Sequence, residues 1–224
     1  MNDAYHKPEW WEENRAFVKK FGVDSGTKRL SHRYIELIGD SGHEMYDRLK
    51  DILPDPSYFI GVDTKPSVVF RHRLAGRPFQ LRYGDFFDVA NKSLQEDSPR
   101  PAIFNYDGTA WIDSLDWWAT NGVALKAVVK ESVKANGIAL VILNLSLTRC
   151  VESASLKTMR LQGHTEKFVQ CFSSDWKLNP REIFVGGGER ENAYQRYTSK
   201  VYEMATLRVK FDRTKITIHN RCKS

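Results

Sequence analysis

The sequence predicts a three-layer α/β protein, in which a mainly parallel sheet lies between two layers of helices. Short runs of branched and aromatic residues alternate with stretches of helical periodicity, which is typical of right-handed βαβ units. One run, residues 137–147, is apolar on both faces, as expected of a central strand that is covered on both sides. The 224 residues are enough to bury such a sheet in one domain.

Residues 1–32 precede the alternating pattern. Apolar side chains recur about once per helical turn between Pro8, which favours a helix start, and Gly22, which favours a helix end. This pattern predicts an amphipathic helix over residues 8–21 and a polar connector after it. The helix is either an appendage of the main domain, residues 33–224, or a flap over a site.

Five strands with intervening helices are predicted next. The strands, each rich in branched or aromatic residues, are residues 33–38, 57–62, 79–83, 101–106 and 137–147. Helices are indicated by apolar side chains one turn apart, which are Met45, Leu49 and Ile52 before the second strand and Leu125, Val128, Val129 and Val133 before the fifth.

The pattern changes in the last third of the chain. We predict a helix around residues 152–172, a strand over residues 181–187, a polar loop over residues 189–200 and a strand over residues 201–211. Two late strands joined by a loop predict an antiparallel hairpin that closes one edge of the sheet.

Charge is distributed unevenly along the chain. The 34 Lys and Arg residues exceed the 28 Asp and Glu residues by six. Residues 1–120 have a net charge of −3, whereas residues 121–224 have a net charge of +9. The basic half is therefore the expected contact for a polyanion such as nucleic acid. The alternative is that the excess of Lys and Arg only keeps the protein soluble.

Several classes of protein are disfavoured by what the sequence lacks. No segment approaches the roughly 18 consecutive apolar residues of a membrane-spanning helix, and the N-terminus lacks the apolar core of a secretory signal. Three cysteines are too few for a disulfide scaffold, and neither cysteine nor histidine spacing suggests a metal site. We therefore expect a cytoplasmic protein without bound metal or membrane contact.

Candidate site residues follow the first four predicted strands. In parallel α/β sheets, ligands bind beyond the carboxyl ends of the strands. Glycines there let the backbone approach a ligand, an acid ending the second strand can accept both hydrogen bonds of a ribose diol, and an acid after the third can receive an exocyclic amine. The candidates at these positions are Glu36, Gly39, Gly42, Asp63, Asp85, Phe86, Asn105, Tyr106 and Asp107.

Residues 33–211 resemble the class I S-adenosylmethionine-dependent methyltransferases, most clearly in YFIGVDTKPSVV and LRYGDFFDV and in the spacing between them. The resemblance implies a Rossmann-like methyltransferase fold with antiparallel last strands. In that family an acid ending strand two holds the ribose, a Gly-Asp-Phe-like element meets the adenine, and a motif after strand four faces the methyl group. It thus implies S-adenosylmethionine as cofactor, bound by Glu36, Gly39, Gly42, Asp63, Asp85, Phe86 and Asn105, with Asp107 and Tyr106 as catalytic residues.

Two turns depart from the family pattern. The turn ELIGDSG has two of the family's three closely spaced glycines and adds Asp40. The element NYDG lacks the Asp/Asn-Pro-Pro-Tyr motif with which amino-methylating DNA enzymes hold a flipped base. This disfavours methylation of adenine N6 or cytosine N4 by the usual arrangement. It leaves open an O, N or C acceptor elsewhere, and also a domain that has lost catalysis.

We therefore predict a methyltransferase that acts on nucleic acid. Two alternatives remain, which are an inactive binding protein of the same fold and a methyltransferase for a small molecule or a protein.

Purely structural roles are also expected for single residues. Asp63 and Asp85 can cap the helices that follow them, and Asp107 can begin a turn. The aromatic residues Trp111, Trp117 and Trp118 are more often core residues than platforms for a base.

Overall fold

The computed structural model describes residues 8–39, 43–106, 116–149, 154–177, 194–198 and 202–218. Its helices are α1 (Pro8–Gly22), α2 (His43–Leu49), the 3-10 turn η1 (Pro56–Tyr58), α3 (Pro66–Leu74), α4 (Phe86–Glu96), the π-turn η2 (Trp118–Gly122), α5 (Val123–Asn136) and α6 (Ala154–Phe172). Its strands are β1 (Arg33–Leu37), β2 (Phe59–Asp63), β3 (Gln80–Tyr83), β4 (Pro101–Tyr106), β5 (Ile138–Arg149), β6 (Tyr194–Thr198), β7 (Tyr202–Asp212) and β8 (Ile216–Ile218).

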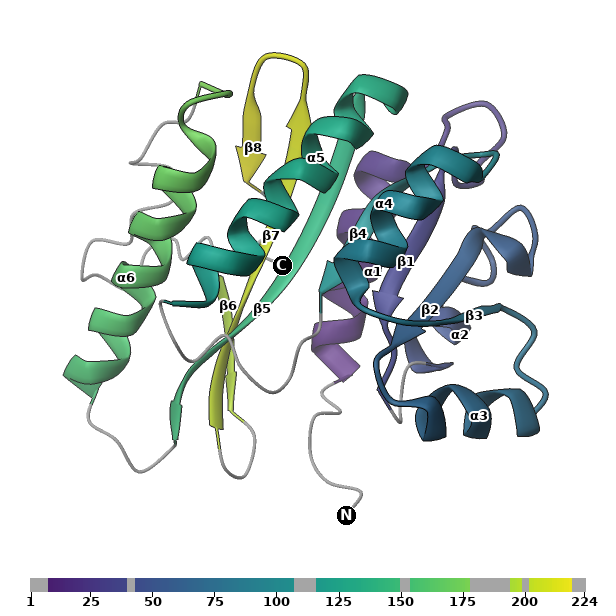
Figure 1. Ribbon diagram of the computed structural model, residues 1–224, viewed down its shortest axis with the longest axis horizontal. Coiled ribbons are helices and arrows are strands. Elements are labelled where there is room, and N and C mark those ends of the chain that lie inside the picture. Colours follow the sequence, from purple (N-terminus) through teal and green to yellow (C-terminus); the bar gives the residue numbers. More distant parts are fainter. Residues whose placement is uncertain are drawn as a thin grey trace.

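All eight strands of the described residues belong to one sheet. Their order is β3-β2-β1-β4-β5-β7-β6, and β8 also pairs with β7. Strands β1 to β5 are parallel, whereas β7 runs antiparallel to β5, β6 and β8. Figure 1 shows β6 and β8 following one another along β7 at the edge of the sheet. The predicted class, a mainly parallel sheet with antiparallel strands at its C-terminal end, is confirmed.

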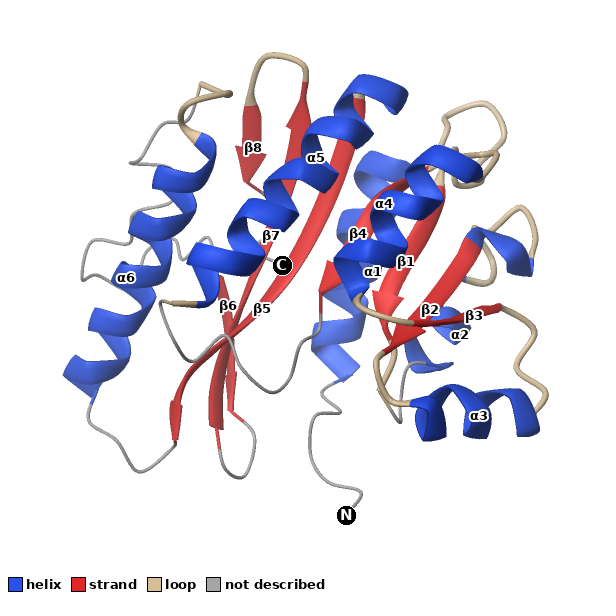
Figure 2. Ribbon diagram, viewed as in Figure 1, coloured by secondary structure: helices blue, strands red, loops and turns tan. Residues whose placement is uncertain are grey.

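Helices cover both faces of the sheet and bury two hydrophobic clusters. The larger cluster joins β1, β2, β4 and β5 to α4, α5 and α6, and includes Phe104, Leu125 and Phe168. The other joins the opposite face to α1, α2 and α3, and includes Phe17, Met45 and Val68. Figure 2 shows this layering, with α4 and α5 in front of the strands and α1 behind them.

Helix α1 is part of the core. Its Phe17 and Val18 side chains are fully buried against the sheet. Asn14, also fully buried, accepts a hydrogen bond of 2.7 Å from the Nε of Arg208 on β7. The first of the two expected arrangements is therefore correct. The helix is packed on the main domain and does not form a flap over the site.

The C-terminal strands differ from the prediction. The hairpin exists, but its first strand is β6, which lies inside the predicted polar loop of residues 189–200, and residues 181–187 lie outside the described part. We also missed β8. Polar Gln195 and Arg196 interrupt the aromatic residues of β6, and an edge strand such as β6 tolerates polar residues because it pairs on one side only. Periodicity alone therefore did not distinguish it from a loop.

Candidate active site

The carboxyl ends of β1 to β4 meet at one edge of the sheet. Because β1 pairs with β2 on one side and β4 on the other, the chain order reverses there, at the switch point where α/β sheets bind ligands. The Ile38 N–H donates to the Val62 carbonyl (3.0 Å), and the Gly84 N–H donates to the Asp63 carbonyl (3.1 Å). The predicted site residues that this edge brings together are Gly39, Asp63, Asp85 and Tyr106.

Asp63 is the last residue of β2, and its side chain is half-buried. One carboxylate oxygen accepts a 2.7 Å hydrogen bond from the Lys65 N–H, which shapes the turn into α3. Within the described residues, the second oxygen accepts no hydrogen bond. Asp63 therefore forms a structural turn and still has acceptor capacity for a ligand hydroxyl.

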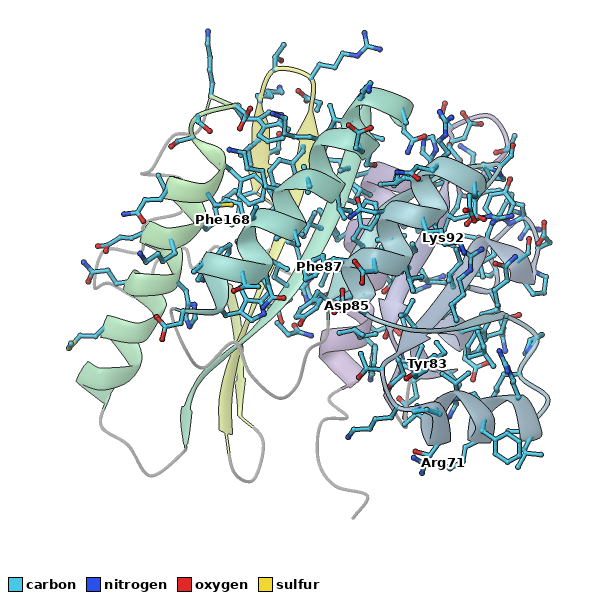
Figure 3. All side chains as sticks on the ribbon, viewed as in Figure 1. Arg71, Tyr83, Asp85, Phe87, Lys92 and Phe168 are labelled. Carbon is cyan, nitrogen blue, oxygen red and sulfur yellow. The ribbon has the colours of Figure 1, made fainter. Side chains whose placement is uncertain are left out.

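Asp85 is exposed at the turn between β3 and α4, in the centre of Figure 3. It is the N-cap of α4, since one carboxylate oxygen accepts hydrogen bonds from the N–H groups of Phe87 (2.8 Å) and Asp88 (3.3 Å). The expected capping role is thus confirmed, and the second oxygen remains available. Phe86 points into the core and is 1% exposed, so the structure places it beneath the edge.

Glu36 and Asn105 lie side by side within the sheet. They are directly paired across β1 and β4, and both are almost completely buried. The Asn105 amide donates a 2.8 Å hydrogen bond to the hydroxyl of Tyr34. The structure therefore brings these two predicted residues together just below the site edge, on the face that α1 covers.

Gly39 begins the turn after β1 with a φ of +47°, which favours glycine, and a Cβ at this position would meet no atom within 4 Å. His72 of α3, itself 6% exposed, donates a 2.8 Å hydrogen bond from Nε2 to the Gly39 carbonyl. Sequence reasoning missed His72 because the histidines show no pattern and the contact joins residues far apart in the chain. Burial lowers the pKa of the neighbouring His43. Gly42 lies outside the described residues.

Ile38 precedes the turn after β1, and the neighbouring strand makes room for its side chain. Ile38 is 3% exposed and packs toward α2 and α3. A Cβ added to Gly61 of β2 would lie 2.6 Å from Ile38 Cγ2 and 3.1 Å from the ring of Phe79. The absent side chain at Gly61 thus makes room for Ile38.

We expect Gly61→Ala to lower the free energy of unfolding by about 1–3 kcal/mol, because it overpacks this contact. The melting temperature of a chain this size should fall by roughly 2–4 °C per kcal/mol. Ile38→Ala should also destabilise, by opening a cavity. Chemical denaturation of the two single variants and the double variant measures their coupling. Equal stability of Gly61→Ala and the parent, or strictly additive effects, would contradict this packing.

Tyr106 ends β4 within an aromatic group. Its ring stacks on Phe87 at 5.2 Å with an interplanar angle of 14°, and it also contacts Phe86 and Trp117. Burial raises the pKa of the Tyr106 hydroxyl, an effect only partly offset by a hydrogen bond with Trp117. At neutral pH this hydroxyl is protonated and cannot act as a base. The next residue, Asp107, lies outside the described residues.

Trp117 and Trp118 are buried, as expected for core residues, and Trp111 lies outside the described part. The Trp118 indole N–H donates a 3.0 Å hydrogen bond to Nδ1 of His164 on α6. The π-turn η2, which begins at Trp118, leads into α5 beside the aromatic group. These residues support the site from below and present no platform to a base.

Lysines on α5 of the basic half are partly neutralised by a neighbouring acid. Lys126 and Lys130 both form ion pairs with Asp175, at 2.8 Å for Lys130. The two lysines lower the pKa of Asp175 well below its ordinary value. These two lysines and Asp175 together contribute only one net positive charge to the surface of this half.

The described ranges contain neither a metal-binding cluster nor a membrane-spanning helix. No group of three His, Cys, Asp or Glu side chains there is arranged to hold a metal ion. None of the helices in these ranges combines the length and the apolar character needed to cross a bilayer.

One feature of the sheet distinguishes it from the parallel dinucleotide-binding order 3-2-1-4-5-6. The antiparallel strand β7 is inserted between β5 and β6, which gives the antiparallel last strands that the sequence resemblance implied. This strand order agrees with the Rossmann-like methyltransferase fold that the sequence resemblance implied.

Solved structures of three methyltransferases are similar to this chain. An O-methyltransferase from Bacillus cereus in complex with SAH is 12% identical, with a TM-score of 0.49 over 92% of this chain and 83% of that one. Aeropyrum pernix fibrillarin with natively bound S-adenosyl-L-methionine is 10% identical, with a TM-score of 0.41 over 88% and 76%. A sugar N-methyltransferase from Streptoalloteichus sp. is 12% identical, with a TM-score of 0.37 over 100% and 79%. No protein-family model and no curated protein matches the chain.

Proposed function

We propose that this chain binds S-adenosylmethionine over the carboxyl ends of β1 to β3 and transfers its methyl group to nucleic acid. The observation that carries the proposal is the pair of carboxylates at this edge. Asp63 and Asp85 follow neighbouring strands, and each uses one oxygen for its own turn and keeps the other available. In a methyltransferase fold these are the positions of a ribose ligand and an adenine ligand.

The residues of this edge fit the proposed cofactor. Asp63 has the acceptor capacity for ribose hydroxyls, and exposed Asp85 can accept from an exocyclic amine. The open space over Gly39 lets a ligand approach the backbone after β1. Ile38 does not occupy this space, since its side chain packs against Gly61.

When bound, S-adenosylmethionine supplies a methyl group activated by a sulfonium. The protein must then place the acceptor in line with that group and, for a weakly acidic acceptor, remove a proton. Tyr106 is unsuited to accept a proton because burial raises its pKa. We therefore assign the proton acceptor to Asp107, which follows it in the sequence. Tyr106 is assigned to the shape of the pocket wall, and Asn105 to support of that wall from below the edge.

Nucleic acid is the proposed acceptor class because residues 121–224 have a net charge of +9, which favours a polyanion. Gel-shift measurements with single- and double-stranded RNA and DNA over a salt series test this assignment. Retention that weakens steeply with salt is expected. A lack of retardation at low salt would move the acceptor to a small molecule or a protein.

Calorimetric titration with S-adenosylmethionine and with its demethylated product tests the cofactor directly. We expect saturable binding of both at one site per chain, and no comparable binding of NAD, a dinucleotide that related parallel sheets hold through a different glycine-rich turn. An absence of binding heat for both sulfur compounds would remove the cofactor assignment. Binding without methyl transfer to any acceptor pool would indicate the inactive binding protein instead.

A further inference from the structure

A group of exposed apolar side chains lies on α3 and β3, at the outer edge of the sheet. Five large apolar residues are strongly exposed in the described part of the chain, and three of them are Phe70 (60%), Leu74 (71%) and Tyr83 (61%). Phe70 and Leu74 are one turn apart on α3, and Tyr83 ends the edge strand β3. Such side chains in one place are typical of a contact surface.

An open hollow of about 510 Å³ lies between these two elements. Its lining residues are Pro66, Ser67, Val69, Phe70, Arg73 and Tyr83. Within the described residues, the rings of Phe70 and Tyr83 make no contact with each other or with another ring. Each ring therefore has a face available to a planar group.

The same segment is strongly cationic. Residues 64–84 contain five Lys and Arg residues and no Asp or Glu, although residues 1–120 as a whole have a net charge of −3. Arg71 and Arg73 are exposed on α3, beside Phe70. Arg73 also donates a long hydrogen bond (3.4 Å) to the Leu81 carbonyl, which holds it against β3. Figure 3 shows Tyr83 close above α3 and Arg71 on the side of α3 away from the sheet.

We propose that this surface, the α3–β3 patch (Phe70, Leu74, Tyr83, Arg71 and Arg73), binds a single-stranded segment of nucleic acid. Aromatic side chains within a cationic groove are the combination that holds single strands, since bases stack on the rings and phosphates pair with the cations. A single strand is required because the bases of a duplex are stacked on one another and cannot reach the rings. The guanidinium groups suit phosphate through paired hydrogen bonds.

The patch adjoins the proposed site. Tyr83 precedes Asp85 by only two residues, and the Gly84 backbone between them is bonded to Asp63. A strand that stacks on Tyr83 is therefore next to the edge where the methyl group would be presented. This inference deepens the proposed function and depends on its nucleic-acid acceptor, but it places the contact on α3 and β3, outside the basic C-terminal half.

Fluorescence anisotropy of the full chain with short labelled single-stranded RNA and DNA tests the proposal. Phe70→Ala and Tyr83→Ala should each weaken binding about 5- to 100-fold through lost stacking. Tyr83→Phe keeps the ring and should bind like the parent. Arg73→Gln should reduce the slope of log affinity against log salt by about 0.7, the loss of one phosphate contact.

Matched controls are Met159→Ala, an exposed apolar residue on α6, and Lys92→Gln, an exposed cation on α4. Both should bind like the parent. Calorimetry with S-adenosylmethionine should be unchanged in all patch variants, which separates the patch from the cofactor site. Oligonucleotide binding that is equal in the parent and in every patch variant would overturn the patch while leaving the proposed function intact. Polyglutamate is a further probe. If it bound as tightly as RNA and the same variants lost this binding, the partner of the patch would instead be an acidic protein.

Discussion

Replacement of Asp107 by asparagine is expected to lower the rate of methyl transfer about 10²- to 10⁴-fold, the usual loss when a positioned general base is removed. Asp107 directly follows Tyr106, whose ring is fixed at the site edge by stacking on Phe87. The Tyr106 hydroxyl is kept protonated by burial, so it cannot replace the lost carboxylate. Turnover of the purified variant under cofactor saturation measures the effect.

Two companion variants decide whether Asp107 acts in chemistry or only in a turn. Asp107→Ala removes the turn-forming oxygen as well as the charge, so a turn former would lower the melting temperature and leave turnover of the folded fraction intact. Tyr106→Phe keeps the stacked ring and should retain most activity. Full turnover in both Asp107 variants would refute the assignment of a base at this position.

The arrangement of the site edge was predictable because it follows from chain order. Four apolar runs separated by helices imply parallel strands whose carboxyl ends meet, and this placed Asp63, Asp85 and Tyr106 on one edge before their contacts were known. The capping role of Asp85 was also readable, since an Asp between a strand and a helix commonly accepts from the first N–H groups of that helix. The same expectation for Asp63 was wrong, because Lys65 is the N-cap of α3 and Asp63 accepts only from the Lys65 N–H.

Contacts between distant parts of the chain were not predictable. The bond from His72 to the Gly39 carbonyl and the fit of Ile38 against Gly61 each depend on how α3 and β2 pack beside the first turn. Sequence periodicity reports which face of an element is apolar, but it does not report the partner of a buried polar atom. For the same reason Phe86, which follows an exposed Asp, was assigned to the ligand although it lies in the core.

The prediction of a polyanion-binding surface was limited because it used the net charge of half the chain. The net charge of residues 121–224 does not show how its charges are arranged. Lys126 and Lys130, for example, share the carboxylate of Asp175, which the same sum also counts. The cations of residues 64–84 lie in the half with negative net charge, and only the structure sets two of them beside exposed rings. The net charge therefore has to be counted over the area that a single partner would contact, because opposite charges within a few ångströms cancel each other.

Asp63→Ala is expected to weaken the binding of S-adenosylmethionine by about 1–3 kcal/mol, or roughly 5- to 150-fold, through the loss of charge-assisted hydrogen bonds to the ribose. The same substitution also removes the acceptor of the Lys65 N–H, so it should cost about 0.5–2 kcal/mol of stability. Calorimetric titration measures the first effect, and chemical denaturation measures the second.

Asp55 provides a matched control at the opposite end of the same strand. It precedes β2, and its carboxylate accepts a hydrogen bond of 2.7 Å from the Ser57 N–H, the same length and spacing as the bond from Lys65 to Asp63. Asp55→Ala should therefore destabilise the protein by a similar amount and leave cofactor affinity unchanged. If both variants lost affinity in proportion to their stability, Asp63 would be a turn residue alone. A loss of affinity confined to Asp63→Ala assigns its carboxylate to the ligand, because both substitutions remove the same kind of turn bond and only Asp63 lies at the site edge.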